Sequence, residues 1–233
     1  MRTLILVLAA SAVAVAHAGQ TPTVADVRQT VDAARKDVDA YRAAGGAAGA
    51  PDHPAIKWES ALWAYRARDP GSETAAMASG EAVRLLVRAE LWDRVHARVA
   101  SLDMDDPAWE RIAGQIYEEG IARKDLRYTI DTLTRAAAVT TRPSIKSAVL
   151  VTLGRAYRRQ GDKAAATRSL EAATSAAPGT PRAEEAEGLL YEIKYLSIGL
   201  PAPPIAGPTR NGRPIDAAAL RGKPVVLVFW GTT

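Results

Sequence analysis

Residues 147–178 read SAVLVTLGRAYRRQGDKAAATRSLEAATSAAP, and they set the fold class of the chain. Apolar residues recur every three or four positions on both sides of Gln160-Gly161-Asp162, as in two amphipathic helices joined by a tight turn. Gly154 and Ala166 have almost no side chain, so two antiparallel helices can approach closely there. Pro178 cannot continue a helix, so the second helix is predicted to end before it.

The same segment resembles a tetratricopeptide repeat, a helix–turn–helix unit of 34 residues. Tyr157 and Leu170 would fill the space between its two helices. The repeat positions that match in one register are Leu150, Leu153, Gly154, Tyr157, Ala166, Leu170, Ala173 and Pro178. One such unit cannot bury its own apolar face, so the resemblance implies that neighbouring helix pairs stack on it. We expect a mainly α-helical, tetratricopeptide-like repeat array over residues 19–196, with a plain helical bundle as the alternative.

The chain before this segment has helical periodicity with a weaker repeat signature. The preceding 34 residues match the repeat only at Gly120 and at a few apolar positions. Ser72 and Asp106-Pro107 are predicted to begin helices, as an N-cap and as an N-cap followed by proline. Helical spacing extends over residues 24–41, around 58–65, and over 73–102, 107–122 and 126–139.

Residues 1–18 have the features of a secretory signal peptide. Arg2 precedes an apolar run over residues 4–16, and Ala16-His17-Ala18 supplies a cleavage site. The run is too short for a membrane-spanning helix, which needs about 20 apolar residues. We therefore expect an exported protein, periplasmic or extracellular, with no stable membrane span after cleavage; an uncleaved anchor is the alternative.

The amino-acid composition limits the kinds of functional site that this chain can form. The formal net charge is +4, from 30 Lys and Arg against 26 Asp and Glu, and the sequence contains no Cys. The charges of both signs are interleaved, which indicates a solvated surface and no nucleic-acid partner. Without Cys, these residues cannot form a disulfide, a thiolate metal site or a thiol nucleophile. His17, His53 and His96 have no metal-ligand spacing, so neither a metal nor a cofactor is expected.

Three further groups of residues, of tryptophan, aspartate and arginine, have ordinary structural interpretations. The four tryptophans of the helical part could line a peptide groove, but core packing between helix pairs is the favoured interpretation. Helix capping accounts for three neighbouring aspartates, and a solvated helix face accounts for three arginines. These residues are Trp58, Trp63, Trp92 and Trp109; Asp103, Asp105 and Asp106; and Arg155, Arg158 and Arg159.

The pattern changes after Tyr195, where residues 197–233 form a separate segment. Its opening is rich in proline and cannot continue a helix, and Asn211-Gly212 predicts a tight turn. The sequence predicts a short strand at 213–215, a helical turn at 217–220 and a strand buried on both faces at 225–230.

This segment resembles the start of the thioredoxin-like α/β domain in TlpA-type and redoxin-type exported thiol–disulfide oxidoreductases. Gly231 and Thr233 stand where that family has alanine and tryptophan, which leaves the subfamily open. The matching positions are Gly199, Pro201, Ala202 and Pro203; Gly212, Arg213 and Pro214; Leu220, Gly222 and Lys223; and Phe229, Trp230 and Thr232.

The resemblance implies thiol chemistry. In this family a Cys-x-x-Cys follows the strand, and its thiolate at a helix N-terminus attacks a substrate disulfide. That motif would begin one residue beyond Thr233, so the chain is expected to be a fragment cut before the catalytic cysteines and inactive by itself. The resemblance also implies a redox partner protein. Gly231 stands where a peroxidatic site usually has threonine, which favours disulfide exchange over peroxide reduction.

Two functions therefore stay open. The first is the N-terminal part of an exported thiol–disulfide oxidoreductase that serves cell redox homeostasis. The second is an exported repeat module that binds protein or peptide partners and has no enzymatic activity.

Overall fold

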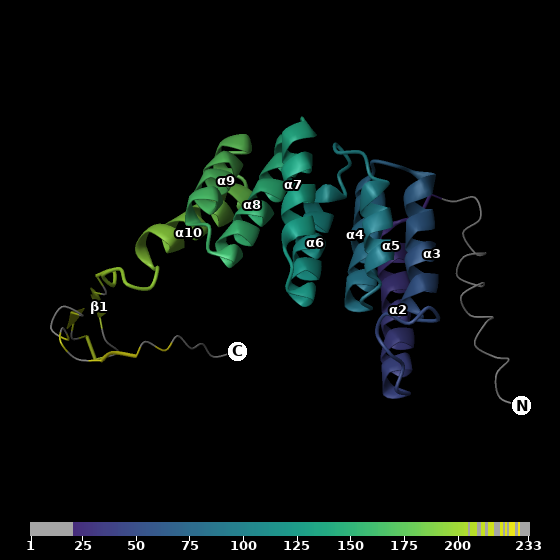
Figure 1. The fold of residues 1–233 in the computed structure, drawn as a ribbon, viewed down its shortest axis with the longest axis horizontal. Coiled ribbons are helices and arrows are strands. Elements are labelled where there is room, and N and C mark those ends of the chain that lie inside the picture. The colour runs from purple at the N-terminus through teal and green to yellow at the C-terminus, as the bar shows by residue number, and fades with distance from the viewer. Residues whose placement is uncertain are drawn as a thin grey trace, which may run out of the picture. The chain divides into compact units, whose positions relative to one another are not determined.

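The chain is mainly α-helical, as predicted, in a computed structural model (Figure 1). The model describes residues 21–204, 206–208, 211, 212, 214–216, 220, 222, 224–226 and 228; the expected signal peptide over 1–18 lies outside them. The helices are α2 (Val24–Ala43), α3 (Ala55–Arg68), α4 (Glu73–Arg88), α5 (Trp92–Ala100), α6 (Trp109–Arg123), α7 (Arg127–Val139), α8 (Pro143–Gln160), α9 (Lys163–Ala176) and α10 (Pro181–Tyr195). None of these helices is long and apolar enough to cross a lipid bilayer.

The chain divides into two compact units, Met1–Glu187 and Gly188–Thr233. The division falls inside α10, whereas the sequence placed the boundary after residue 196. Burial along α10 explains the difference, because its buried residues, Ala183 and Ala186, both precede the division. Tyr191 and Tyr195, which follow it, are exposed.

In the first unit, alternate helices form a row. Helix α4 packs on α6, and α6 packs on α8. The other helices attach to this row, with α3 against α4 and both α7 and α9 against α8. This pattern of neighbours is consistent with a helical repeat array.

Helix α2 begins with a capping box. The Thr23 hydroxyl accepts a hydrogen bond from the Asp26 amide at 3.3 Å, and the Asp26 carboxylate accepts one from the Thr23 amide at 2.7 Å. The predicted face is buried through Val27, Val31, Ala34 and Val38. Two of these valines form a core cluster with Leu62, Tyr65, Ala78 and Ala82.

Two sequence-based boundaries are wrong. The single helical stretch predicted over 73–102 is two helices, because the chain turns at Glu90, whose φ of 57° is left-handed. Helix α6 begins at Trp109, two residues after the expected start. The Asp106 carboxylate accepts a hydrogen bond from the Ala108 amide at 2.8 Å, so Asp106 caps a turn that precedes the helix. Ser72 caps α4 as predicted, accepting from the Ala75 amide at 3.1 Å.

The two predicted helices of segment 147–178 are α8 and α9. The predicted turn between them is also found, since Gly161 has a φ of +85° and Asp162 accepts a hydrogen bond from the Ala165 amide. Helix α9 ends two residues before Pro178, in agreement with the prediction. The contact between the helices is close at Gly154, where a Cβ atom would lie 2.7 Å from Leu170 Cγ. Gly120 allows a similar approach, since a Cβ there would lie 2.5 Å from Thr129 Oγ1.

Replacing Gly154 by alanine is expected to destabilise the protein by about 1–3 kcal/mol, because the added methyl group overpacks the contact with Leu170. Helix propensity alone predicts the opposite sign, a gain of about 1 kcal/mol. Gly114 in α6 is the matched control, since a Cβ there would meet no atom within 4 Å. Urea unfolding followed by circular dichroism should show Gly154→Ala less stable and Gly114→Ala slightly more stable than the parent. A gain in both variants would contradict the close approach.

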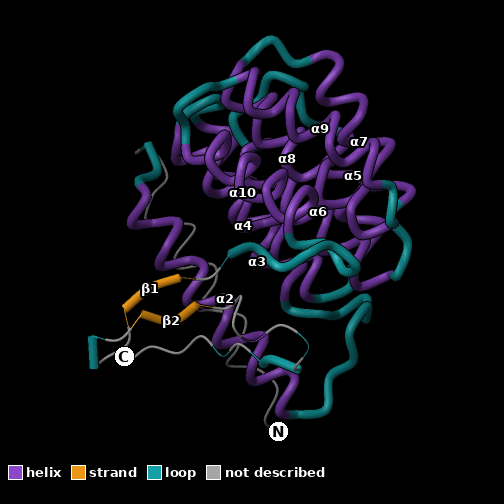
Figure 2. Tube along the Cα trace, turned by 90° about the vertical axis from the view of Figure 1, so that its left-hand side faces the viewer, coloured by secondary structure: helices purple, strands orange, loops and turns teal. Residues whose placement is uncertain are grey.

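The second unit contains a small β-hairpin (Figure 2). Strand β1 (Ala206–Pro208) pairs antiparallel with β2 (Pro214–Asp216), in the register Gly207 to Ile215. Gly212 in the connection has a φ of +75°, which suits the predicted Asn-Gly turn. Strand β2 lies one residue later than the short strand predicted at 213–215, and β1 was not predicted.

The buried strand predicted at 225–230 is not found in the residues that the structure describes. Val225, Val226 and Val228 are exposed and lie outside any strand, while the other three positions fall outside the described residues. A strand needs a neighbouring ladder to satisfy its backbone groups. The only ladder among the described residues is the hairpin β1–β2. Of the predicted helical turn, Leu220 lies in a 3₁₀ turn and residues 217–219 are outside the described residues.

Candidate functional site

The repeat-signature residues form the packing core between α8 and α9. Tyr157 is half-buried, and Pro178 is exposed after the end of α9. Ser147 adds a buried hydrogen bond from its hydroxyl to the carbonyl oxygen of Ala173, at 3.0 Å. The buried signature residues are Leu150, Leu153, Gly154, Ala166, Leu170 and Ala173. These residues build the helix pair, so a binding site on this unit must be made by other side chains.

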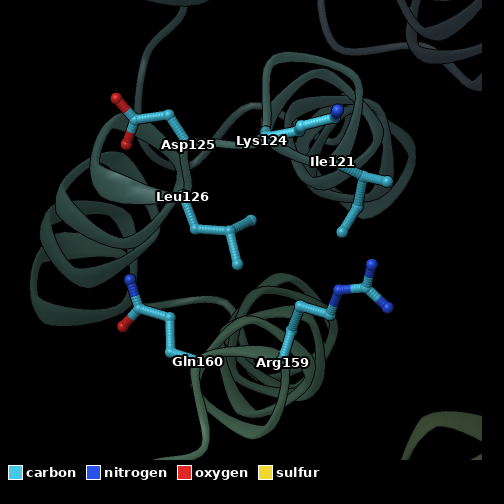
Figure 3. Close-up of a pocket in the computed structure, with 7 residues that line it drawn as sticks. Ile121, Lys124, Asp125, Leu126, Arg159 and Gln160 are labelled. Atoms are coloured by element: carbon cyan, nitrogen blue, oxygen red, sulfur yellow. The ribbon is translucent and has the colours of Figure 1, made fainter.

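One cleft lies at the C-terminal ends of α6 and α8, where α7 begins, and has a volume of about 320 Å³. Figure 3 shows Leu126 and Arg159 extending toward its centre, with Ile121 beside them. Lys124 and Asp125 lie at its edge, and Lys124 adopts a left-handed φ of 56° to end α6. The cleft therefore combines the apolar side chains of Ile121 and Leu126 with charges of both signs.

The charge of Asp125 is held in place by its neighbour Arg127. Hydrogen bonds from the side chain and the amide of Arg127 lower the pKa of the Asp125 carboxyl to about 2. Asp125 consequently remains ionised at neutral pH, with both carboxylate oxygens bonded to Arg127.

A second, larger cleft of about 510 Å³ lies at the N-terminal ends of α4, α6, α8 and α10. We call it the arginine cleft, because Arg111, Arg142 and Arg182 line it together with Glu73 and Glu110. The remaining lining residues are the small or compact Gly71, Ala76 and Pro107.

Asp105 fixes the loop that carries Arg142. Its carboxylate accepts hydrogen bonds from the Thr140 hydroxyl at 2.7 Å and from the amide and hydroxyl of Thr141 at 2.8 and 2.9 Å. These bonds, the one from the Thr140 side chain first, lower the pKa of Asp105 to about 2. The Asp105 carbonyl oxygen also accepts from Arg142 Nη1 at 3.2 Å, so the loop before α8 is tied to the loop before α6.

Two buried glutamates were missed by sequence reasoning. Glu59 in α3 is fully buried and bonds to Arg98 of α5, whose guanidinium lies 4.7 Å from the Trp63 ring centre. Glu119 in α6 is 1% exposed and accepts from Arg123. Both glutamates lie in helices of ordinary amphipathic pattern, so only the packing of the neighbouring helices distinguishes them from surface residues.

His96 contacts Glu119 and is stacked on Tyr128. The His96 Nε2 atom lies 2.7 Å from Glu119 Oε1, and the His96 and Tyr128 ring centres are 3.8 Å apart. Burial raises the pKa of the Tyr128 hydroxyl. This cluster links α5, α6 and α7. Among the described residues, no group of three or more His, Asp or Glu is arranged to hold a metal ion.

The residues of the C-terminal family resemblance are only partly described. Gly199, Pro201 and Ala202 are exposed, and Pro203 is half-buried. Gly199 and Gly222 have φ values of +91° and +83°, which favour glycine. Lys223, Phe229, Trp230 and Thr232 lie outside the described residues.

Of the tryptophans and arginines singled out in the sequence, some lie in the core and others at the surface. Trp58 and Trp109 are buried, while Trp63 and Trp92 are half-buried. Arg155 pairs with Glu185, whereas its exposed neighbour Arg159 lines the cleft of Figure 3. One arginine of the predicted solvated face thus lines a candidate binding surface.

Comparison with protein-family models, with curated proteins and with solved structures finds no match to this chain in any of the three.

Proposed function

We propose that this chain is the partner-binding, N-terminal part of an exported thiol–disulfide oxidoreductase. The helical unit, a tetratricopeptide-like array, binds a protein or peptide partner, and the segment from residue 197 begins a thioredoxin-like domain. The observation that carries the binding role is the row α4–α6–α8, which has a charged cleft at each end of its helices. Clefts of this size lie within the usual range for ligand sites, about 300–1,000 Å³.

The redox part of the proposal rests on the ordered motifs after residue 197. Gly199, Pro201 and Gly212 occur in the family's order, and the hairpin β1–β2 around Gly212 is compatible with the start of an α/β domain. An export signal at residues 1–18 fits an oxidising compartment, where disulfides form and persist.

The second candidate is an exported repeat module that only binds other proteins. Val225, Val226 and Val228 favour it, because they are exposed and outside any strand where the thioredoxin-like domain would have its central strand.

Site-specific photocrosslinking tests both candidates. Benzoylphenylalanine is placed at Arg159 in the cleft of Figure 3, at Arg111 in the arginine cleft, and at exposed Arg28 of α2 as the control. We expect a discrete protein adduct from at least one cleft position and none from position 28. The purified adduct partner should then bind the purified chain with a Kd in the micromolar range, about −8 kcal/mol.

The outcomes separate the candidates. A partner whose cysteines change their disulfide state, detected by thiol alkylation, when the gene is deleted would favour the oxidoreductase. A partner without cysteines would favour the binding-only module. Equal adducts from all three positions, or failure of the purified partner to bind, would overturn the proposed binding function.

A further inference from the structure

We propose that the arginine cleft binds a short acidic peptide segment through its carboxylates. This inference rests on the proposed binding function and assigns it a place and a ligand chemistry. Three arginines from separate parts of the chain meet in one cleft of about 510 Å³, beside the N-terminal ends of four helices. Arginine is suited to carboxylates because its planar guanidinium can donate two parallel hydrogen bonds.

Arg111 is held ready for a ligand. Its aliphatic stem lies against Gly80 of α4, where an added Cβ would be 2.8 Å from Arg111 Cβ and 3.2 Å from Cδ. The stem is thus positioned by packing, while the residue as a whole is exposed. Among the described residues, the Arg111 guanidinium has no ion-pair or hydrogen-bond partner. Its five donors are consequently available to a ligand in the cleft.

Arg142 places a positive charge where α8 already has one. It occupies the N-cap of α8, has no capping hydrogen bond from its side chain, and is followed by no acidic residue in the first turn. A helix N-terminus carries about half a positive charge, and the Asp105 carboxylate, which accepts from the Thr141 amide at 2.8 Å, partly compensates it. A ligand carboxylate would pair with the Arg142 guanidinium, which donates here to a neutral carbonyl oxygen. The hydrogen bond from Arg142 Nη1 to the Asp105 carbonyl keeps this side chain in the cleft.

Two hydrogen bonds hold the Arg182 guanidinium in place. Its Nη1 atom donates to Glu185 at 2.8 Å, and its Nη2 atom donates to the Glu110 carbonyl at 3.5 Å. Glu185 also forms an ion pair with Arg155, so its single negative charge is shared between two arginines. The Arg182 side chain remains 47% exposed and can contact a ligand.

The two glutamates of the cleft do not cancel its positive charge. Glu73 and Glu110 lie in the first turns of α4 and α6, where they face the positive ends of their own helices. The three arginines outnumber the two glutamates of the lining, so the cleft favours an anionic ligand. Gly71, Ala76 and Pro107 leave room for a peptide backbone between the charged groups.

The test measures binding of a fluorescein-labelled Asp-Glu-Asp-Glu peptide to the purified chain by anisotropy at 50 and 200 mM salt, between which the Debye length falls about twofold. We expect saturable binding that weakens at higher salt. Arg111→Gln and Arg142→Gln should each weaken it about tenfold, the effect of losing one charge-assisted hydrogen bond. Arg28→Gln, which removes the same charge from an exposed position on α2, should change it less than about twofold. Circular dichroism should show that all three variants keep the parental helix content.

Several results would overturn the inference. They are absence of binding, equal binding of an Asn-Gln-Asn-Gln peptide, equal weakening by Arg28→Gln, or equally tight binding of a short single-stranded DNA. If the peptide fails while the crosslinked partner still binds and is insensitive to Arg111→Gln, the assignment to this cleft falls and the proposed function stands. If no partner binds at all, the proposed function itself falls.

Discussion

Replacing Trp109 by alanine is expected to lower the free energy of unfolding by about 3–5 kcal/mol. Trp109 is fully buried at the start of α6, the helix that packs against both α4 and α8. Its indole Nε1 also donates a hydrogen bond to the Asp103 carbonyl oxygen at 2.9 Å. The substitution removes the largest fully buried side chain of the described residues and leaves that carbonyl without its donor.

Such a loss is a large part of the 5–15 kcal/mol that typically stabilises a domain. Trp92→Ala is the matched control, because Trp92 in α5 is only half-buried. Urea unfolding followed at 222 nm should show a clearly lower midpoint for Trp109→Ala and a smaller shift for Trp92→Ala. Equal shifts would mean that the row α4–α6–α8 does not depend on Trp109.

Replacing Arg98 by methionine is expected to destabilise the protein by about 3 kcal/mol, because it leaves the Glu59 carboxylate buried without its main partner. Glu59 is 0% exposed and Arg98 is 29% exposed, so the removed charge faces a group that water cannot reach. The effect lies at the lower end of the usual range because Arg94 stays 3.5 Å from the same carboxylate and because Arg98 is partly solvated.

A double-mutant cycle tests this pair. Glu59→Met combined with Arg98→Met should be more stable than Arg98→Met alone, since the double variant buries no unpaired charge. Thermal and urea unfolding of the four proteins give the coupling free energy. If the losses of the two single variants simply add, the two side chains do not interact, and the buried pair contributes nothing specific to the contact between α3 and α5.

Much of the helical unit follows from local pattern. The spacing of Val27, Val31 and Val38 predicts the buried face of α2, and Ser72 predicts the start of α4. The α8–α9 pair was predicted with its turn at Gly161, because glycine there allows a left-handed conformation that other residues resist. The break at Glu90 was not predictable in this way, since the apolar spacing continues across it and Glu90 has no intrinsic preference for a positive φ.

The grouping of residues into the two candidate clefts could not be predicted from the sequence. Arg111, Arg142 and Arg182 are far apart along the chain, and each lies near the start of a different helix. They share one cleft because α6 and α8 pack together with their N-terminal ends on the same side, where the start of α10 also lies. Arg159 belonged to a face expected to be solvated, yet it lines the cleft of Figure 3.

Helix formation depends on residues three or four positions apart, so the amino-acid pattern alone predicted most of the helices, the cap at Ser72 and the small residue at Gly154. Whether a charged side chain is buried, paired or exposed depends on which helices pack against it. In the sequence, Glu59 cannot be distinguished from a surface glutamate, and its burial depends on the packing of α5, which carries Arg98. Arg111 likewise resembles any surface arginine, and its stem is positioned only by contact with Gly80 of α4. Contacts of this kind join residues that are distant in the chain, and only the packed fold specifies them.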